Sequence, residues 1–166
     1  MAEADLTDIY RRYRQGLFTL ALSVTGCPAR AEDAVHDAFA RLCRKVEPLA
    51  GRRDSQAVAY VFAAVRNAAI DQVRRAPRES DDAITQSLFS LTAGPAQSAI
   101  DSERQRSIAA AVDSLPADQR EVVVLRVYGQ LTFADVAGVV GAPLATVAAR
   151  YRRALERLRL RLERVL

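Results

Sequence analysis

The stretch from Thr132 to Arg164 constrains the fold more than any other part of this 166-residue chain. Thr132 and Asp135 have the spacing of a capping box, which predicts that a helix starts at Thr132. Gly141 suits the left-handed residue that ends such a short helix. Apolar residues then recur at every third or fourth position over 147–165, and this spacing predicts a second, longer amphipathic helix.

Arginines run along the second helix in a stripe beside the apolar one: Arg150, Arg153, Arg157, Arg161 and Arg164. Two helices joined by a tight turn, the second of them basic, form the outline of a helix-turn-helix DNA reader. The simpler alternative is that the arginines only solvate an amphipathic helix. Glu156 and Glu163 are the only acids after Val147, so the segment cannot balance its own charge, and DNA contact is the favoured interpretation.

Composition points to an all-α protein. Half of the residues are hydrophobic, 27% are charged and Trp is absent, while Ala and Leu are abundant, which favours helices over a β-rich fold. The net charge of +4 and the isoelectric point near 9.5 are compatible with a polyanionic partner without being diagnostic of one.

The N-terminal residues are charged and have no apolar core of the kind a signal peptide needs. No apolar run is long enough to span a bilayer, so we expect a cytoplasmic protein without membrane insertion. Cys27 and Cys43 have no CxxC partner and are expected to be small core residues. Together with His36 they match no zinc spacing, so we expect no metal site and no cofactor.

Three amphipathic helices are predicted in the first half: 5–25, ending at Gly26; 28–46, opening with Pro28; and 55–76, capped by Ser55. The third has a predicted buried stripe of Val58, Phe62, Val65, Ala69 and Val73.

Polar residues mark two of these helices. The outer face of the second carries Glu32, Asp33, His36, Asp37 and Arg41, an order that complementarity to the helix dipole would explain equally well. The end of the third carries Arg66, Asn67, Asp71, Arg74 and Arg75. Asparagine is a poor helix former, so Asn67 is either tolerated on a solvated face or present to hydrogen-bond a specific partner.

Helical periodicity is lost over about 25 residues after Pro77, and this length favours a linker over an internal loop. The sequence therefore predicts two small helical domains, 1–77 and 104–166, joined by a flexible linker at 78–103. In the second domain we expect Asp118 to cap a helix that runs to Tyr128.

Three segments, taken in order, resemble the extracytoplasmic-function sigma factors of the bacterial sigma-70 family. AEDAVHDAF (31–39) resembles the region-two helix that docks on core RNA polymerase. AYVFAAVRNAAIDQVRR (59–75) resembles the helix that reads the promoter element near the start site. The segment 115–158 resembles region four, which reads the more distant element.

The resemblance implies a subunit without catalysis of its own, which binds core RNA polymerase, recognises promoter DNA and helps to melt it. Asn67 stands at the position that receives an extruded non-template base, and an amide can match the hydrogen-bonding edge of a base. The other implied contacts to this proximal element are Arg66, Arg74 and Arg75 on phosphates, with Arg52 and Arg53 covering the base. Polymerase would be contacted by Glu32, Asp33, His36, Asp37 and Arg41. The helix-turn-helix would approach DNA through Thr146, Arg150, Arg153 and Arg157.

This chain departs from the family pattern in places. His36, Asp37 and Ala38 replace the usual Gln, Glu and Thr, and Tyr60 stands where tryptophan is frequent. Ala148 and Ala149 replace a cation and a hydroxyl in the part of the recognition helix that is nearest the bases. Each missing bidentate contact forgoes about 1–3 kcal/mol of discrimination, so we expect weaker reading of the distal element.

Two other classes of function fit the sequence less well. A stand-alone helix-turn-helix regulator with an N-terminal sensor module would have no reason to pair the acidic helix with the RNxxxDxxRR helix end. An enzyme finds no support, because the sequence has one histidine, no glycine-rich phosphate loop and no assembled nucleophile set. The resemblance makes an anti-sigma factor a candidate partner, although no residue indicates one.

Overall fold

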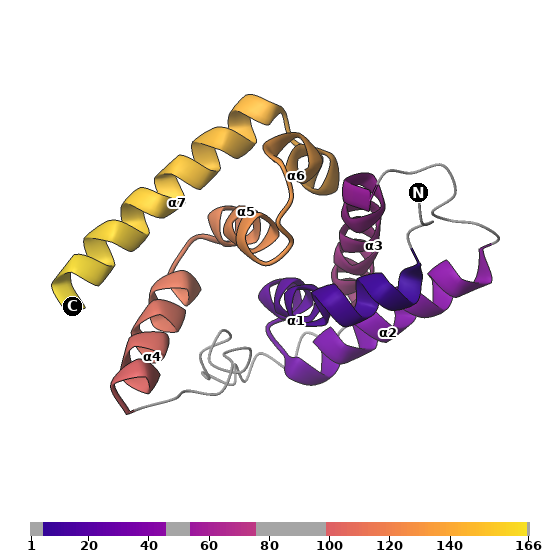
Figure 1. The fold of residues 1–166 in the computed structure, drawn as a ribbon, viewed down its shortest axis with the longest axis horizontal. Coiled ribbons are helices and arrows are strands. Elements are labelled where there is room, and N and C mark those ends of the chain that lie inside the picture. The colour runs from indigo at the N-terminus through magenta and orange to yellow at the C-terminus, as the bar shows by residue number, and fades with distance from the viewer. Residues whose placement is uncertain (1–4, 46–53, 76–98, 166) are drawn as a thin grey trace.

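The computed structural model describes residues 5–45, 54–75 and 99–165. All the regular structure in these ranges is helical (Figure 1). The helices are α1 (Leu6–Thr25), α2 (Pro28–Arg44), α3 (Asp54–Arg75), α4 (Ala99–Asp113), α5 (Ala117–Val127), α6 (Phe133–Val140) and α7 (Leu144–Val165).

Helices α1, α2 and α3 pack against one another in pairs and form the N-terminal module. The Asp5 carboxylate accepts a hydrogen bond from Thr7 N at 3.0 Å and so caps α1, while Gly26 ends the helix in the left-handed region at φ 67°. The centre of the module is fully buried and includes Leu17, Leu20, Phe62 and Val65. The predicted bounds of these helices agree with the structure to within one or two residues at each described end.

In the C-terminal module, α4, α5 and α6 pack against the long helix α7. Asp135 N donates to Thr132 Oγ1 at 3.1 Å, and Gly141 lies in the left-handed region at φ 69°, which confirms the predicted start and stop of α6. The Asp135 carboxylate accepts a hydrogen bond from the Thr132 hydroxyl at 2.9 Å. In a complete capping box it would instead accept from the backbone N–H of Thr132. Aspartate is one methylene shorter than the glutamate that normally closes the box.

Several details correct the sequence predictions. Asp118 is not the N-cap of α5, because the helix begins at Ala117 with Pro116 at the cap position; the Asp118 carboxylate instead accepts from Gln119 N at 2.9 Å within the first turn. Val73 is 44% exposed and so is not a core residue, because it lies in the last turn of α3. Cys27 is half-buried and Cys43 is exposed, so neither is the small core residue that we expected. Helix α4 begins at Ala99, within the stretch predicted to be the linker.

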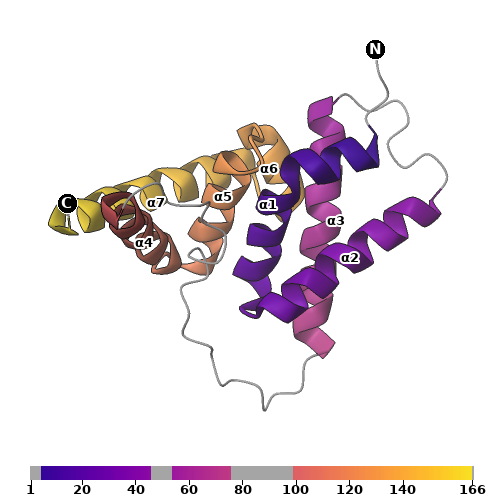
Figure 2. The same cartoon turned by 60° about the horizontal axis from the view of Figure 1, so that its bottom comes forward.

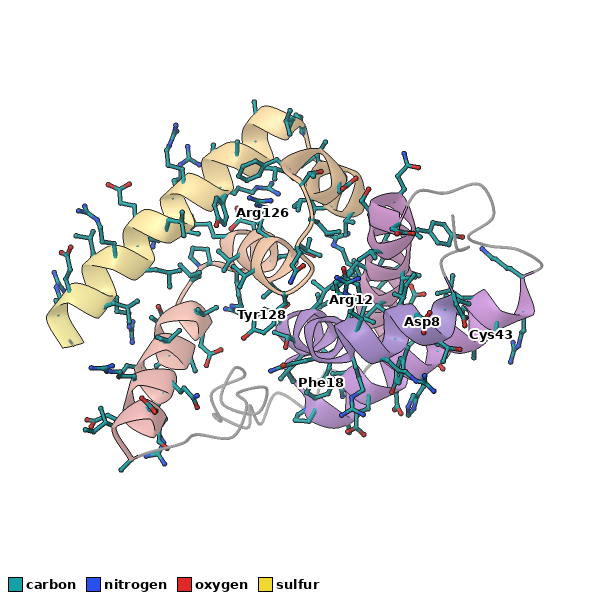
Figure 3. All side chains as sticks on the ribbon, in the orientation of Figure 1. Asp8, Arg12, Phe18, Cys43, Arg126 and Tyr128 are labelled. Atoms are coloured by element: carbon teal, nitrogen blue, oxygen red, sulfur yellow. The ribbon has the colours of Figure 1, made fainter. Side chains whose placement is uncertain are left out.

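Arg126 holds the helix-turn-helix together (Figure 3). Its Nη1 donates to Leu131 O at 2.5 Å, and its Cζ lies 4.4 Å from the centre of the Phe133 ring and 5.6 Å from that of Tyr151. The two rings meet edge to face, with their centroids 5.3 Å apart. One guanidinium therefore links the end of α5, the start of α6 and the first half of α7 through a charge-assisted hydrogen bond and cation–π contacts.

The two modules also pack against each other, α1 against α5 and α3 against α6 (Figures 1 and 2). Their buried apolar residues form one continuous cluster. The modules approach closely at Gly16, where an added Cβ would lie 3.0 Å from Tyr128 Cβ and 3.3 Å from Tyr128 O. Glycine at this position lets α1 and α5 come together nearly backbone to backbone.

No single helix in the described ranges is long and apolar enough to cross a membrane. Helices α6 and α7 reach that threshold only when they are taken together, and they are bent by 104° with respect to each other.

We expect Arg126→Ala to lower the free energy of unfolding by about 2–4 kcal/mol, because it removes a charge-assisted hydrogen bond and two ring contacts at once. Urea unfolding followed by far-ultraviolet circular dichroism measures this change. Arg152→Ala is the matched control, since Arg152 is exposed on α7 and its truncation should change stability by less than about 0.5 kcal/mol. Equal losses in the two variants would show that Arg126 does not hold the module together.

Candidate nucleic-acid interface

The polar end of α3 is largely solvent-exposed. Asn67, Arg74 and Arg75 are exposed, and they lie in the second half of a helix whose other face is buried against α1 and α2. The exposed side chains present two cations and an amide with both donor and acceptor atoms. Three of the residues predicted for the proximal element are therefore accessible together.

Asn67 also lines a hollow of about 460 Å³ between α2 and α3. Its lining mixes small apolar side chains with an aromatic ring and three cations: Ala38, Arg41, Leu42, Arg44, Lys45, Tyr60, Ala63, Ala64 and Asn67. An aromatic ring can stack on a planar ligand, an amide can bond to its edge, and cations attract the charge attached to it. Tyr60, noted in the sequence only as a replacement for tryptophan, thus lies in one hollow with Asn67.

Two polar contacts tie α2 to the end of α3. Gln72 Nε2 donates to Asp37 Oδ2 at 3.2 Å, and Arg41 Nη1 lies 3.6 Å from Asp71 Oδ2. Asp37 is consequently only half-exposed, while Glu32, Asp33 and His36 are exposed. The predicted polymerase-contacting face thus divides into a solvent-facing part and a part that bonds to α3.

Arg66 lies apart from the other predicted DNA-contacting residues of α3. Its guanidinium Nε bonds to Glu121 Oε1 of α5, in the other module, and the two side chains are only 22% and 13% exposed. Sequence reasoning missed Glu121 because nothing in either segment indicates that α3 and α5 meet. Arg52 and Arg53 lie outside the described residues.

The start of α7 presents fewer free cations than its sequence suggests. Arg150 Nε lies 3.5 Å from Asp118 Oδ2, and Arg150 and Thr146 are half-buried. Arg153 and Arg157 are exposed, as is Ala148. The exposed cations of α7 therefore begin at Arg152 and Arg153, about one turn beyond the residues that would lie nearest a base edge.

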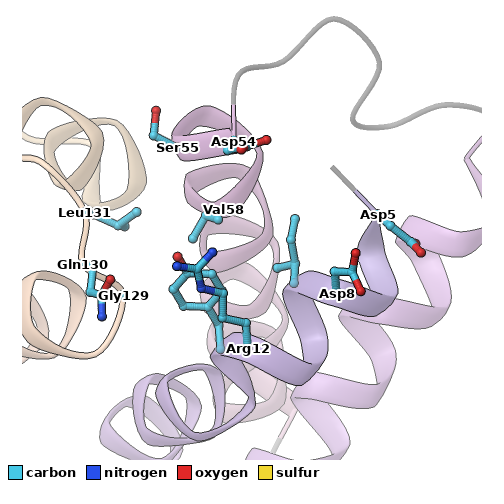
Figure 4. A pocket seen from close by; sticks show the side chains of 11 residues that line it. Asp5, Asp8, Arg12, Asp54, Ser55, Val58, Gly129, Gln130 and Leu131 are labelled. Carbon is cyan, nitrogen blue, oxygen red and sulfur yellow. The ribbon is translucent and has the colours of Figure 1, made fainter. Parts of the chain in front are cut away.

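A second hollow, of about 340 Å³, lies between the two modules (Figure 4). The Arg12 side chain extends into it from α1, facing the segment 129–131 of the other module, with Asp54 and Ser55 of α3 at its far rim. Among the described residues, no three or more His, Cys, Asp or Glu side chains gather closely enough to hold a metal ion.

Two family models match this chain. The sigma-70 region 2 model matches residues 9–79, and the sigma-70 region 4 model matches residues 105–158.

Curated relatives agree with both models. The chain is 30% identical over 143 residues to the ECF RNA polymerase sigma factor EcfG of Rhodopseudomonas palustris, an alignment that covers 86% of this chain and 76% of the relative. It is 24% identical over 159 residues to the ECF RNA polymerase sigma factor RpoE of Cereibacter sphaeroides, covering 95% of this chain and 86% of the relative.

A solved structure supports the same assignment. The sigma factor RpoE of Bartonella quintana, crystallised in complex with the anti-sigma factor NepR, superposes with a TM-score of 0.70 at 25% identity. The match covers 96% of this chain and 97% of that one. Because both halves match in order and over nearly their full length, this chain belongs to the extracytoplasmic-function sigma factors of the sigma-70 family, the non-enzymatic subunits through which RNA polymerase recognises promoter DNA.

Proposed function

We propose that the hollow between α2 and α3 receives a base extruded from the non-template strand of the proximal promoter element, and that the chain thereby helps to melt the duplex. The observation that carries this proposal is the exposed Asn67 on the same hollow as Tyr60. An extruded base is read through its hydrogen-bonding edge and held by stacking, and these two side chains supply both interactions.

Cations around the hollow would hold the strand on either side of the extruded base. Arg74 and Arg75 are exposed beyond Asn67, and Arg44 and Lys45 line the hollow. Phosphate contacts of this kind position a strand without reading its sequence. In this proposal Asn67 contributes sequence preference and the cations contribute affinity. Arg52 and Arg53 remain predicted contacts to the same base.

The exposed acids of α2 are proposed to dock on core polymerase. Glu32 and Asp33 project from the first turns of α2, with His36 one turn further on, and all three are exposed. The hydrogen bond from Gln72 to Asp37 and the ion pair of Arg41 with Asp71 couple this face to the end of α3. Polymerase bound at α2 would thus be mechanically connected to the strand-binding end of α3.

Helix α7 is proposed to contact the distal promoter element, mostly through phosphates. Arg153 and Arg157 are exposed, and Thr146 and Arg150 are the remaining predicted contacts. The ion pair with Asp118 engages Nε of Arg150, and its Nη donors would be the ones to contact a phosphate. The exposed Ala148 offers a methyl group but no hydrogen-bonding atom, which supports weak sequence reading at this end.

In this proposal the polymerase carries out the chemistry and the chain acts in the cytoplasm, where polymerase meets chromosomal promoters. The proposed domains are 1–77 and 104–166 with a linker at 78–103, and the last residues of that linker already belong to α4. Because the structurally similar RpoE of Bartonella quintana is solved with the anti-sigma factor NepR, an anti-sigma factor is also a proposed partner of this chain.

The test of the proposed function is transcription from fragmented genomic DNA by core polymerase with and without this chain, with sequencing of the transcript ends. We expect a small set of start sites that appear only when the chain is present. A chain that forms no complex with core polymerase, or that yields no specific start sites, would contradict the proposal.

On a promoter found in this way, we expect Asn67→Ala to leave core binding unchanged and to lower open-complex formation by about tenfold, because it removes the hydrogen bonds to the extruded base. Permanganate footprinting of unpaired thymines measures promoter opening. Asn67→Asp keeps the shape and one acceptor but loses the amide donor, so it should also open poorly. Normal opening by both variants would reject Asn67 as the base-reading residue.

We further expect the double variant Glu32→Arg, Asp33→Arg to weaken core binding by at least about tenfold, because it reverses the charge of the exposed face of α2. Titration of core polymerase against fluorescently labelled chain measures the affinity. The control is Glu156→Arg, Glu163→Arg, which makes the same charge change on exposed acids of α7. Equal weakening by both pairs would show that overall charge matters and that the α2 face does not.

A further inference from the structure

The first two turns of α7 expose only apolar side chains. Between 144 and 150 the exposed residues are Leu144, Ala145 and Ala148, and Leu144 is 53% exposed. Val147, in the same turn, is fully buried, so the core lies on a different face of the helix. At about 100° per residue, the three exposed side chains fall within one sector of about 100°. They therefore form a single surface, the apolar patch of α7.

The position of this patch is what makes it informative. A single exposed leucine needs no explanation, because isolated apolar side chains are common on protein surfaces. Here, however, no exposed side chain of the two turns offers a hydrogen-bonding atom, although the proposed function places this end of α7 nearest the bases. The next exposed residues along the helix are the cations Arg152 and Arg153. The start of α7 thus presents an apolar surface bordered by positive charge.

The major groove of DNA offers such a surface one complementary group. The base edges there carry hydrogen-bonding atoms, and thymine carries a methyl group at C5 as well. Packing this methyl against leucine and alanine removes apolar surface from water on both sides. Packing the same side chains over the amino group of cytosine would desolvate a polar group without giving it a partner. Arginine contacts to phosphates would hold the helix over the groove without distinguishing sequences.

We infer that the apolar patch of α7 reads the distal promoter element through the C5-methyl groups of its pyrimidines, with Leu144 as a specificity-determining residue. This inference rests on the proposed role of α7 at that element and names the chemical group that it reads. Thymine is the ordinary source of the methyl group, and 5-methylcytosine carries the same group in a G·C pair. Each methyl group contacted should contribute about three- to fourfold to discrimination.

The first part of the test compares thymine with uracil. The full chain, with and without core polymerase, is used to select binding sites from duplexes of random sequence. The enriched duplexes are then resynthesised with uracil in place of each thymine in turn, which removes only the C5-methyl group and leaves base pairing intact. We expect uracil to weaken binding about three- to fourfold at one or more positions of the site and to have no effect outside it.

The second part separates the methyl group from the rest of thymine. At each position that is sensitive to uracil, the T·A pair is replaced by a C·G pair with or without a methyl group on C5 of the cytosine. The two cytosines have the same hydrogen-bonding edge. We expect the methylated duplex to bind about three- to fourfold more tightly than the unmethylated one.

The third part tests whether α7 makes the contact. Leu144 does not belong to the buried core, so Leu144→Ala should leave the fold intact, which far-ultraviolet circular dichroism checks. In this variant the thymine and uracil duplexes should bind almost equally at the position that Leu144 contacts. The matched control is Leu160→Ala, because Leu160 is 50% exposed on the same helix, about 24 Å from Leu144. The control should keep the full dependence on the methyl group.

Equal binding of thymine and uracil duplexes at every position would overturn the inference, and so would the same methyl dependence in Leu144→Ala as in the parent chain. Selection of no sites, or of sites without A·T pairs, would also overturn it. A chain that gives no specific start sites in the transcription experiment but depends on the methyl groups here would lose the proposed function and keep this inference. Specific start sites without methyl dependence would do the reverse.

Discussion

Burial of apolar surface between the two modules is the constraint on which the arrangement of the described helices depends. Each module contains only three or four of the described helices, and small modules bury a modest fraction of their surface when they fold alone. Here the core around Leu17 and Phe62 continues into the core around Val124 and Leu125. Gly16 allows this continuity, because a larger residue would hold α1 and α5 apart. Arg66 of α3 is partly covered by this contact between the modules, whereas Asn67, Arg74 and Arg75 of the same helix stay exposed.

Local rules predicted the helices well and their packing poorly. Asp5, Gly26, Thr132 and Gly141 act at the helix ends through contacts within a few residues, so the sequence alone places those ends. Helical periodicity likewise predicted that Asn67 would lie away from the core. The prediction that Val73 is buried was wrong because the apolar periodicity continues into the last turn of α3. The neighbouring helices no longer cover the side chain there.

Two charged residues escaped prediction because their partners are distant in sequence. Arg126 meets Phe133 and Tyr151 only after α5, α6 and α7 have folded together, and Glu121 meets Arg66 across the two modules. The sequence analysis singled out neither residue. The family resemblance assigned Arg66 to phosphate, an assignment that describes the chain on DNA, whereas the structure describes the chain without it.

The contacts of Arg126 with Phe133 and Tyr151 also help to fix the direction of α7, and therefore the position of its C-terminal end. The helix contacts Arg126 at Tyr151 and packs against the core through Ala154 and Leu158, and Arg164 lies beyond these contacts near its C-terminal end. At about 1.5 Å per residue, Arg164 lies roughly 20 Å beyond Tyr151. A tilt of about 10° at Tyr151 would therefore move the tip by roughly 3.5 Å, more than the length of a hydrogen bond. The contacts of Arg126 with Phe133 and Tyr151 would thus help to hold the proposed phosphate-contacting arginines of α7 in a fixed register.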